Sequence, residues 1–172
     1  MTEREVHWPY KPGYDLETDN IRLEMYRLLN QFLAEDALSS LMERDAWLVH
    51  AIDIVGHLFT AECQRILIQA AVVARIKDDN EAESRLKIGA FETTCGTLVS
   101  DIDRPNELSR LCLREACNKI IHALRFHYDI ETLDGREVIR PTVYLYGIKG
   151  KKEWKVTLNI IDFIKHFINN VT

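Results

Sequence analysis

The chain has 172 residues, of which 47% are hydrophobic and 28% are charged, and its formal net charge is −5. That length suits one domain with a sizeable hydrophobic core, and the acidic balance argues against a nucleic-acid binder that is basic throughout. The charge is uneven, because residues 1–134 hold 15 Lys and Arg against 24 Asp and Glu, whereas residues 135–172 hold 7 against 3. A basic C-terminal part on an acidic body can mark a binding surface.

The amino terminus, MTEREVHWPY, lacks the apolar core of a signal peptide, and no apolar run is long enough to span a bilayer. We therefore expect a cytoplasmic protein that makes no contact with membranes. The four cysteines occur within apolar patterns and form no CxxC pair, which favours buried, reduced thiols over disulfides or zinc ligands. These residues are Cys63, Cys95, Cys112 and Cys117.

The first part of the chain is predicted to be helical after a short arm. Residues 1–17 contain Pro9 and Pro12 among several aromatic residues, which indicates an extended arm. From residue 18 to residue 125 apolar side chains recur mostly at steps of three and four, which predicts a helical bundle. The expected helices run from residue 18 to about 34–40, over 40–77, over 83–101 and over 107–125.

Beyond Arg125 the hydrophobic period changes from 3.6 to 2, and Asp134-Gly135 supplies a turn signal. We therefore expect a small antiparallel β-meander over residues 126–158. Asn159 is placed to cap a closing helix at 159–170. The predicted fold is mainly α: a single domain with a four- to five-helix bundle, a small C-terminal β-meander and a C-terminal helix.

The predicted helix at 107–125 carries the main candidate site. On a helical wheel Leu111 is the one apolar residue on an otherwise polar arc. Arg114, Asn118 and His122 lie on that arc within about 80° of one another. Histidine can move a proton near neutral pH, and a guanidinium can hold a phosphate. The flanking arginines, Arg110 and Arg125, are candidate nucleic-acid ligands.

Arg114 and His122 are too far apart to act on one phosphate from the same helix. Eight residues of helical rise separate them by about 12 Å. A two-fold dimer could bring the arginine of one subunit to the histidine of the other. The alternative interpretation is a solvated helix face with an ordinary histidine.

The segment LREACNKIIHA resembles the signature helix of the HEPN superfamily, helical-bundle proteins found among prokaryotic toxins, antiviral systems and RNA-processing enzymes. In that family an arginine, often followed by a polar residue, precedes a histidine by four to six intervening residues. Asn118 and His122 match the polar residue and the histidine. Cys117 stands where the arginine is expected, and Arg114 leaves seven intervening residues.

The resemblance implies a metal-independent endoribonuclease, or an RNA-binding protein, of a prokaryotic stress or defence system. In such a site His122 would be general base or acid at the ribose 2′-hydroxyl. Arg114 would steady the phosphate, and Asn118 would orient one of the two. The implied partners are a second copy of the chain, RNA, and an antitoxin or defence-system protein, with no cofactor. The alternative is a non-catalytic helical interaction or dimerisation module.

Two other patterns are weaker candidates. His50, Asp53 and His57 at i, i+3 and i+7 are residue types that bind zinc, iron or manganese. Two histidines two turns apart do not easily bind one ion, however, so buried or interfacial polar residues are the alternative.

The second pattern is a basic loop that follows the expected strand at Val143–Tyr146. Its lysines, Lys149, Lys151 and Lys152, could meet nucleic-acid phosphates. They could equally belong to a solvated hairpin, or keep an exposed strand edge from pairing.

Overall fold

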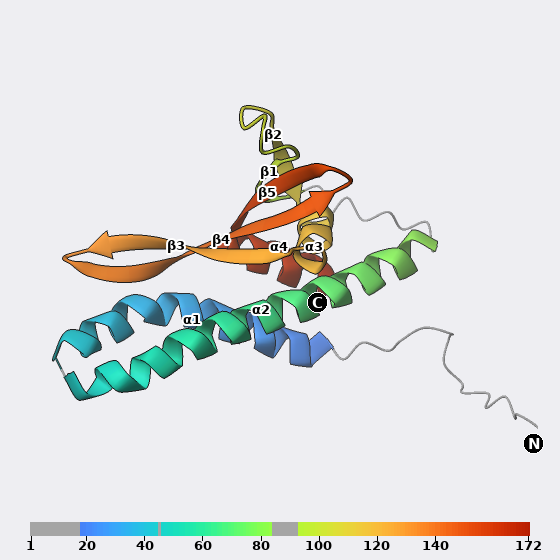
Figure 1. The fold of residues 1–172 in the computed structure, drawn as a ribbon. Helices are drawn as coiled ribbons and strands as arrows, with labels where there is room; N and C mark the ends of the chain where they lie inside the picture. The colour runs from blue at the N-terminus through green and yellow to red at the C-terminus, as the bar shows by residue number, and fades with distance from the viewer. Residues whose placement is uncertain (1–17, 45, 84–92) are drawn as a thin grey trace, which may run out of the picture.

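Four helices lie on one side of a five-stranded antiparallel sheet (Figure 1). This computed structural model describes residues 18–44, 46–83 and 93–172. The predicted arm at 1–17 lies outside the described residues. For some residues within the helices the structure describes the backbone but not the side chain, namely residues 18, 19, 36, 39, 42–57 and 80–83.

The helical layer is built on an antiparallel hairpin of two long helices, α1 (Thr18–Arg44) and α2 (Ala46–Glu83). Each helix buries a stripe of apolar residues at steps of three and four, as an amphipathic helix does. The stripe on α1 consists of Ile21, Met25, Leu28 and Phe32, and that on α2 includes Phe59, Cys63, Ile66, Ala70 and Ala74. Phe32 and Phe59 join the two helices, with ring centroids 5.1 Å apart in an edge-to-face contact.

The sheet consists of β1 (Thr94–Val99), β2 (Leu108–Cys112), β3 (Arg125–Leu133), β4 (Arg136–Lys149) and β5 (Lys152–Asn159). Its strand order is β2-β1-β5-β4-β3, and all neighbours are antiparallel. Alternate residues of the central strands enter the core, as the two-residue period of a strand requires. Val143 and Leu145 of β4 and Val156 and Leu158 of β5 are fully buried.

Two short helices follow strands and close the core. Helix α3 (Leu113–Ile121) begins directly after β2, and α4 (Ile160–Val171) begins directly after β5. Asn159 caps α4, because its side-chain oxygen accepts a hydrogen bond from the Asp162 amide at 3.0 Å. This closing helix therefore forms where the sequence predicts it. Its buried residues are Ile160, Phe163, Ile164, Phe167 and Val171, whereas Ile161 and Ile168 are exposed.

The predicted mainly α fold is wrong, although the two long helices form as predicted. The range 18–125 holds two strands, and these join the C-terminal strands in one sheet instead of leaving a small meander at 126–158. Strands β3, β4 and β5 do occupy the 126–158 region, but Thr97 and Val99 of β1 pair with Thr157 and Lys155 of β5. The protein is therefore an α/β fold and not a helical bundle with an appendage.

The predicted helix at 83–101 is a strand in its second half, while residues 84–92 lie outside the described residues. A register shift between Thr94 and Thr97 marks a bulge in β1, so buried Cys95 and Leu98 are three residues apart. Gly96 permits this bulge, because a Cβ there would lie 2.0 Å from the carbonyl oxygen of Thr157. Because of the bulge, the buried residues of β1 have the three-residue spacing that is typical of a helix.

The predicted helix at 107–125 is also shorter than expected. Its first residues form β2, and α3 starts only at Leu113, after Cys112 in an extended conformation. Leu111, the apolar residue that did not fit the helical wheel, is fully buried as an inward-facing residue of β2.

Candidate nucleic-acid interface

The face of the sheet that points away from the helices carries aromatic and cationic side chains on β3, β4 and β5. Tyr144 and Tyr146 project from this face because they alternate with buried residues of β4. The strand register places Tyr144 between His127 and Thr157, and Tyr146 between Arg125 and Lys155. We call these six residues the tyrosine patch.

Positive groups lie directly against the two tyrosine rings. The Nζ atom of Lys155 is 4.7 Å from the ring centroid of Tyr144 and 5.8 Å from that of Tyr146. The guanidinium carbon of Arg125 lies 5.1 Å from the Tyr146 centroid, and the His127 ring lies 5.1 Å from it at a tilt of 50°. Cation–π contacts at exposed sites contribute about 0.5–1 kcal/mol each. Rings and positive charges are therefore interleaved on one surface.

Acidic residues at the border of the patch hold part of it in place. The Tyr144 hydroxyl donates a hydrogen bond to Asp129 at 3.1 Å. Burial and this hydrogen bond raise the pKa of Tyr144, so the hydroxyl remains protonated. Arg125 is hydrogen-bonded to the carboxylate of Glu153. Lys155, by contrast, lies over both rings and provides the central positive charge.

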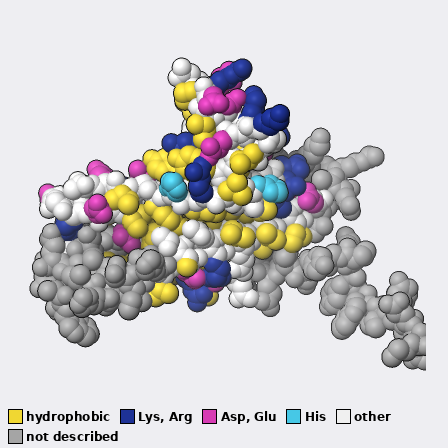
Figure 2. Space-filling model, viewed as in Figure 1, with side chains coloured by type: hydrophobic (Ala, Val, Ile, Leu, Met, Phe, Trp, Pro, Cys, Tyr) yellow, Lys and Arg dark blue, Asp and Glu magenta, His cyan; other side chains and the backbone are white. Residues whose placement is uncertain are grey.

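The basic loop lies at one end of the same two strands. Lys149 and Lys152 are paired at the β4–β5 turn, and Lys151 lies between them; all three are exposed. Lys152 also contacts Asp101 at 2.9 Å, and this hydrogen bond lowers the pKa of the Asp101 carboxyl. Three residues separate this end from the patch, or about 10 Å along a strand. Figure 2 shows Lys and Arg side chains gathered over the strands that rise above the long helices.

The described contacts do not bring Arg114, Asn118 and His122 together. Arg114 Nε lies 3.1 Å from Asp78 Oδ2 of α2, so the guanidinium is already paired with a carboxylate. The Asn118 side chain donates a hydrogen bond to Glu115 at 3.3 Å. His122 is the exposed C-cap residue of α3, and only its backbone N–H contacts Asn118, through the carbonyl oxygen at 3.1 Å. Arg114 and Asn118 therefore lie on α3 and His122 at its C-cap, and no described contact joins their side chains within one chain.

The two arginines that were expected to flank this helix lie on strands. Arg110 is exposed on β2, where it pairs with Thr97 of β1. Arg125 begins β3, which is at the opposite edge of the sheet from β2. Arg125 belongs to the tyrosine patch, whereas Arg110 lies well away from it.

The structure adds no support for a metal site. His50, Asp53 and His57 fall within α2, but their side chains lie outside the described part of the chain. Among the described residues, no group of three or more His, Cys, Asp or Glu is placed to hold a metal ion.

The sequence analysis missed Tyr144, Tyr146 and His127 as site residues. A signal for them exists in the alternation of VYLY, because buried Val143 and Leu145 force the two tyrosines onto the opposite face. The pairing that brings His127 and Lys155 beside them depends on strand register, which the sequence pattern does not specify.

No protein-family model, curated protein or solved structure matches the chain. The function must therefore be inferred from the geometry of the described residues. Among the described helices, none has a stretch long and apolar enough to cross a membrane.

Proposed function

We propose that the protein binds single-stranded RNA across the tyrosine patch. The observation that carries this proposal is the interleaving of two tyrosine rings with Lys155, Arg125 and His127 on a sheet face that no described helix covers. Proteins bind single strands by stacking bases on aromatic rings beside a positively charged path for the backbone. The patch offers both elements.

The spacing of the tyrosines suits separate bases. Residues two apart on a strand are about 7 Å apart, which is twice the 3.4 Å rise between stacked bases. Each ring can therefore receive its own base, while Lys155 lies between the rings and can meet the phosphate that joins the nucleotides. Lys149 and Lys151 extend the path toward the β4–β5 turn.

The polar neighbours of the rings favour RNA over DNA. The Thr157 side chain shares the outward face with Tyr144, and Asp129 borders it. A hydroxyl and a carboxylate can both bind a ribose 2′-hydroxyl, the group that distinguishes RNA from DNA.

The proposal retains the RNA ligand of the sequence analysis but moves it from α3 to the sheet. Cleavage by Arg114 and His122, a toxin role and an antitoxin partner stay predictions of the HEPN resemblance. Arg114 is already paired with Asp78, as Arg125 is with Glu153, so the proposal depends chiefly on Lys155, whose Nζ lies over both tyrosine rings.

The test is a fluorescence-anisotropy titration of labelled single-stranded RNA with the wild type and the double variant Tyr144→Leu/Tyr146→Leu. Stacking contributes about 1–3 kcal/mol per base, so the double variant should bind at least about 30-fold more weakly. The control is Leu108→Ala, which changes an exposed residue on β2, at the opposite edge of the sheet from β3, and should bind as the wild type does. DNA of the same sequence and duplex RNA should bind more weakly than single-stranded RNA. Equal binding by the double variant and the control would refute the proposed site.

A further inference from the structure

The side of the α1–α2 hairpin that faces away from the core is unexpectedly apolar. Tyr26 of α1 is 63% exposed and Leu58 of α2 is 61% exposed. At 100° per residue both project away from the buried stripes of their helices. Other apolar residues share this outward side, namely Leu23, Leu41, Ala61, Ile68 and Val72. A surface hairpin normally presents polar residues there.

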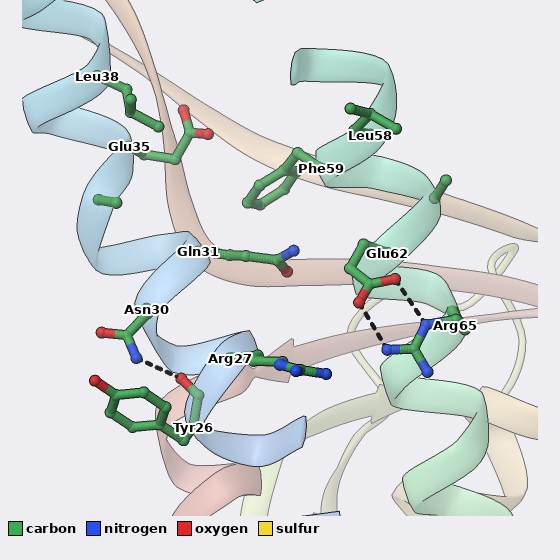
Figure 3. Close-up of a pocket in the computed structure, with 12 residues that line it drawn as sticks. Tyr26, Arg27, Asn30, Gln31, Glu35, Leu38, Leu58, Phe59, Glu62 and Arg65 are labelled. Carbon is green, nitrogen blue, oxygen red and sulfur yellow. Dashed lines mark hydrogen bonds and ion pairs between the residues drawn. The ribbon is translucent and has the colours of Figure 1, made fainter. Parts of the chain in front are cut away.

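A cavity of about 810 Å³ opens between the two helices on this side. In Figure 3 Gln31 and Leu38 extend from α1 toward α2, and Phe59 extends from α2 toward α1. The walls are mostly apolar, yet the Oε1 atom of Gln31 is buried without a hydrogen-bond partner among the described residues. A buried acceptor without a partner is costly. These features of the cavity are those of a surface that a binding partner covers.

The charged residues at one end of the cavity are balanced. Arg65 contacts Glu24 and Glu62 at 2.6 Å, and Arg27 contacts Glu24 at 2.9 Å. Two arginines and two glutamates thus pair with one another. Glu35 also lines the cavity, and burial raises the pKa of its carboxyl.

We propose that a second copy of the chain docks on this side, so that two α1–α2 hairpins pack face to face as a four-helix bundle. An isologous interface uses the same patch on both subunits and must be self-complementary. This surface offers both a hollow and protruding apolar side chains, Tyr26 and Leu58, that can enter the hollow of the other copy. A donor from the partner can then satisfy Gln31.

The size of the hairpin matches a stable dimer. The described side chains cover residues 20–41 of α1, except 36 and 39, and residues 58–79 of α2, and each stretch spans about 33 Å at 1.5 Å per residue. With helices about 10 Å wide, the described outward side offers roughly 650 Å² per subunit, which falls within the range of about 600–1,000 Å² that each partner buries in a standard interface. Because the tyrosine patch lies on the opposite side of the sheet from the helices, both patches of the dimer stay accessible.

The test is the mass of the full chain measured by light scattering and by sedimentation over a range of concentrations. We expect twice the 20.0 kDa mass of the chain. Leu58→Glu and Tyr26→Glu place charges in the interface and should raise the dimer dissociation constant by about 100-fold or more. Both side chains are mostly exposed, so circular dichroism of the variants should match the wild type. Leu124→Glu, at a site 67% exposed and away from the hairpin, is the matched control and should remain dimeric.

A second variant tests the hollow itself. Ala34 lines the cavity, so Ala34→Trp should occupy it, leave the monomer folded and weaken the dimer. A wild type that stays monomeric at every concentration would overturn the proposal and leave another protein or a small apolar molecule as the occupant. Equal dissociation in Leu124→Glu and Leu58→Glu would overturn it as well.

Discussion

The Nε atom of Arg114 lies 3.1 Å from Oδ2 of Asp78, so α3 is tied to α2 by an ion pair between its first turn and the end of the long helix. Asp78 is largely buried, whereas Arg114 is half exposed. A cation in this position holds the two helices together. Asp78 Oδ2 also lies 3.7 Å from Arg75 Nη1, so this carboxylate joins an arginine of each helix. A phosphate at Arg114 would have to compete with that carboxylate.

Arg114→Ala is therefore expected to lower stability and to leave RNA binding unchanged. A half-exposed ion pair contributes about 0.5–1 kcal/mol, so the free energy of unfolding should fall by roughly that amount. Urea denaturation measures the first effect, and RNA anisotropy the second. Arg104→Ala is the control, since this exposed arginine lies outside both α3 and the tyrosine patch and should matter little for either quantity. A folded Arg114→Ala variant that has lost RNA binding would instead place the RNA on α3.

Lys155→Met is expected to weaken RNA binding and to reduce its salt dependence. Each phosphate neutralised on a single strand contributes about 0.7 to the slope of log K against log salt concentration. If Lys155 contacts one phosphate, the slope should fall in magnitude by about 0.7, while Lys165→Met on α4 should leave it unchanged. Binding titrations at several salt concentrations measure both slopes. Identical slopes for Lys155→Met and the wild type would show that Lys155 contacts no phosphate.

Periodicity predicted the elements whose burial is regular. The buried residues of the long helices, of β5, of β4 from Val143 to Gly147 and of the helix capped by Asn159 follow a period of 3.6 or 2. Strand β3, by contrast, has a register shift between Tyr128 and Ile130. Periodicity predicted a helix where β1 forms, because the bulge near Gly96 places the buried residues of this strand three positions apart instead of two. At β2 the misfit of Leu111 on the helical wheel was the only local sign of a strand.

The sequence predicted the candidate site less well than it predicted the fold. The residues that matched a motif, Asn118 and His122, lie close in the chain, whereas the tyrosine patch assembles from three strands. Tyr146, Arg125 and Lys155 are neighbours only because the sheet pairs β4 with both β3 and β5. Register of this kind arises from the packing of the whole sheet and leaves no contiguous pattern.

Gly147→Ala is expected to destabilise the protein by overpacking. A Cβ at this buried position would lie 2.1 Å from Cζ2 of Trp154 and 2.9 Å from the carbonyl oxygen of His122. The indole is itself buried beneath Lys119, so it has little room to move. Overpacking of this kind typically costs about 1–3 kcal/mol, which urea denaturation can measure. Gly135→Asn is the control, because Gly135 has a positive φ that asparagine tolerates and open space around it. Equal stability of both variants would contradict the packing described for Trp154.

The cysteines are expected to differ sharply in reactivity. Burial raises the pKa of Cys63 and of Cys95 to about 12 and also raises that of Cys117. At pH 8 a thiol with that pKa is ionised in about one molecule in ten thousand, and the thiolate is the reactive form. Ellman's reagent should therefore modify one partly exposed thiol, Cys112, in the native protein and all four cysteines after unfolding.

The raised thiol pKa values also predict how stability depends on pH. The unfolded thiols lose their protons near pH 9, whereas the folded ones keep theirs to about pH 12. The folded state therefore binds more protons in this interval, and the free energy of unfolding should fall as the pH rises through it. Urea denaturation between pH 8 and about pH 11 measures this slope, and Cys63→Ala should reduce it. A slope in Cys63→Ala as steep as in the wild type would show that the Cys63 thiol is ionised to the same extent in the folded and unfolded chains.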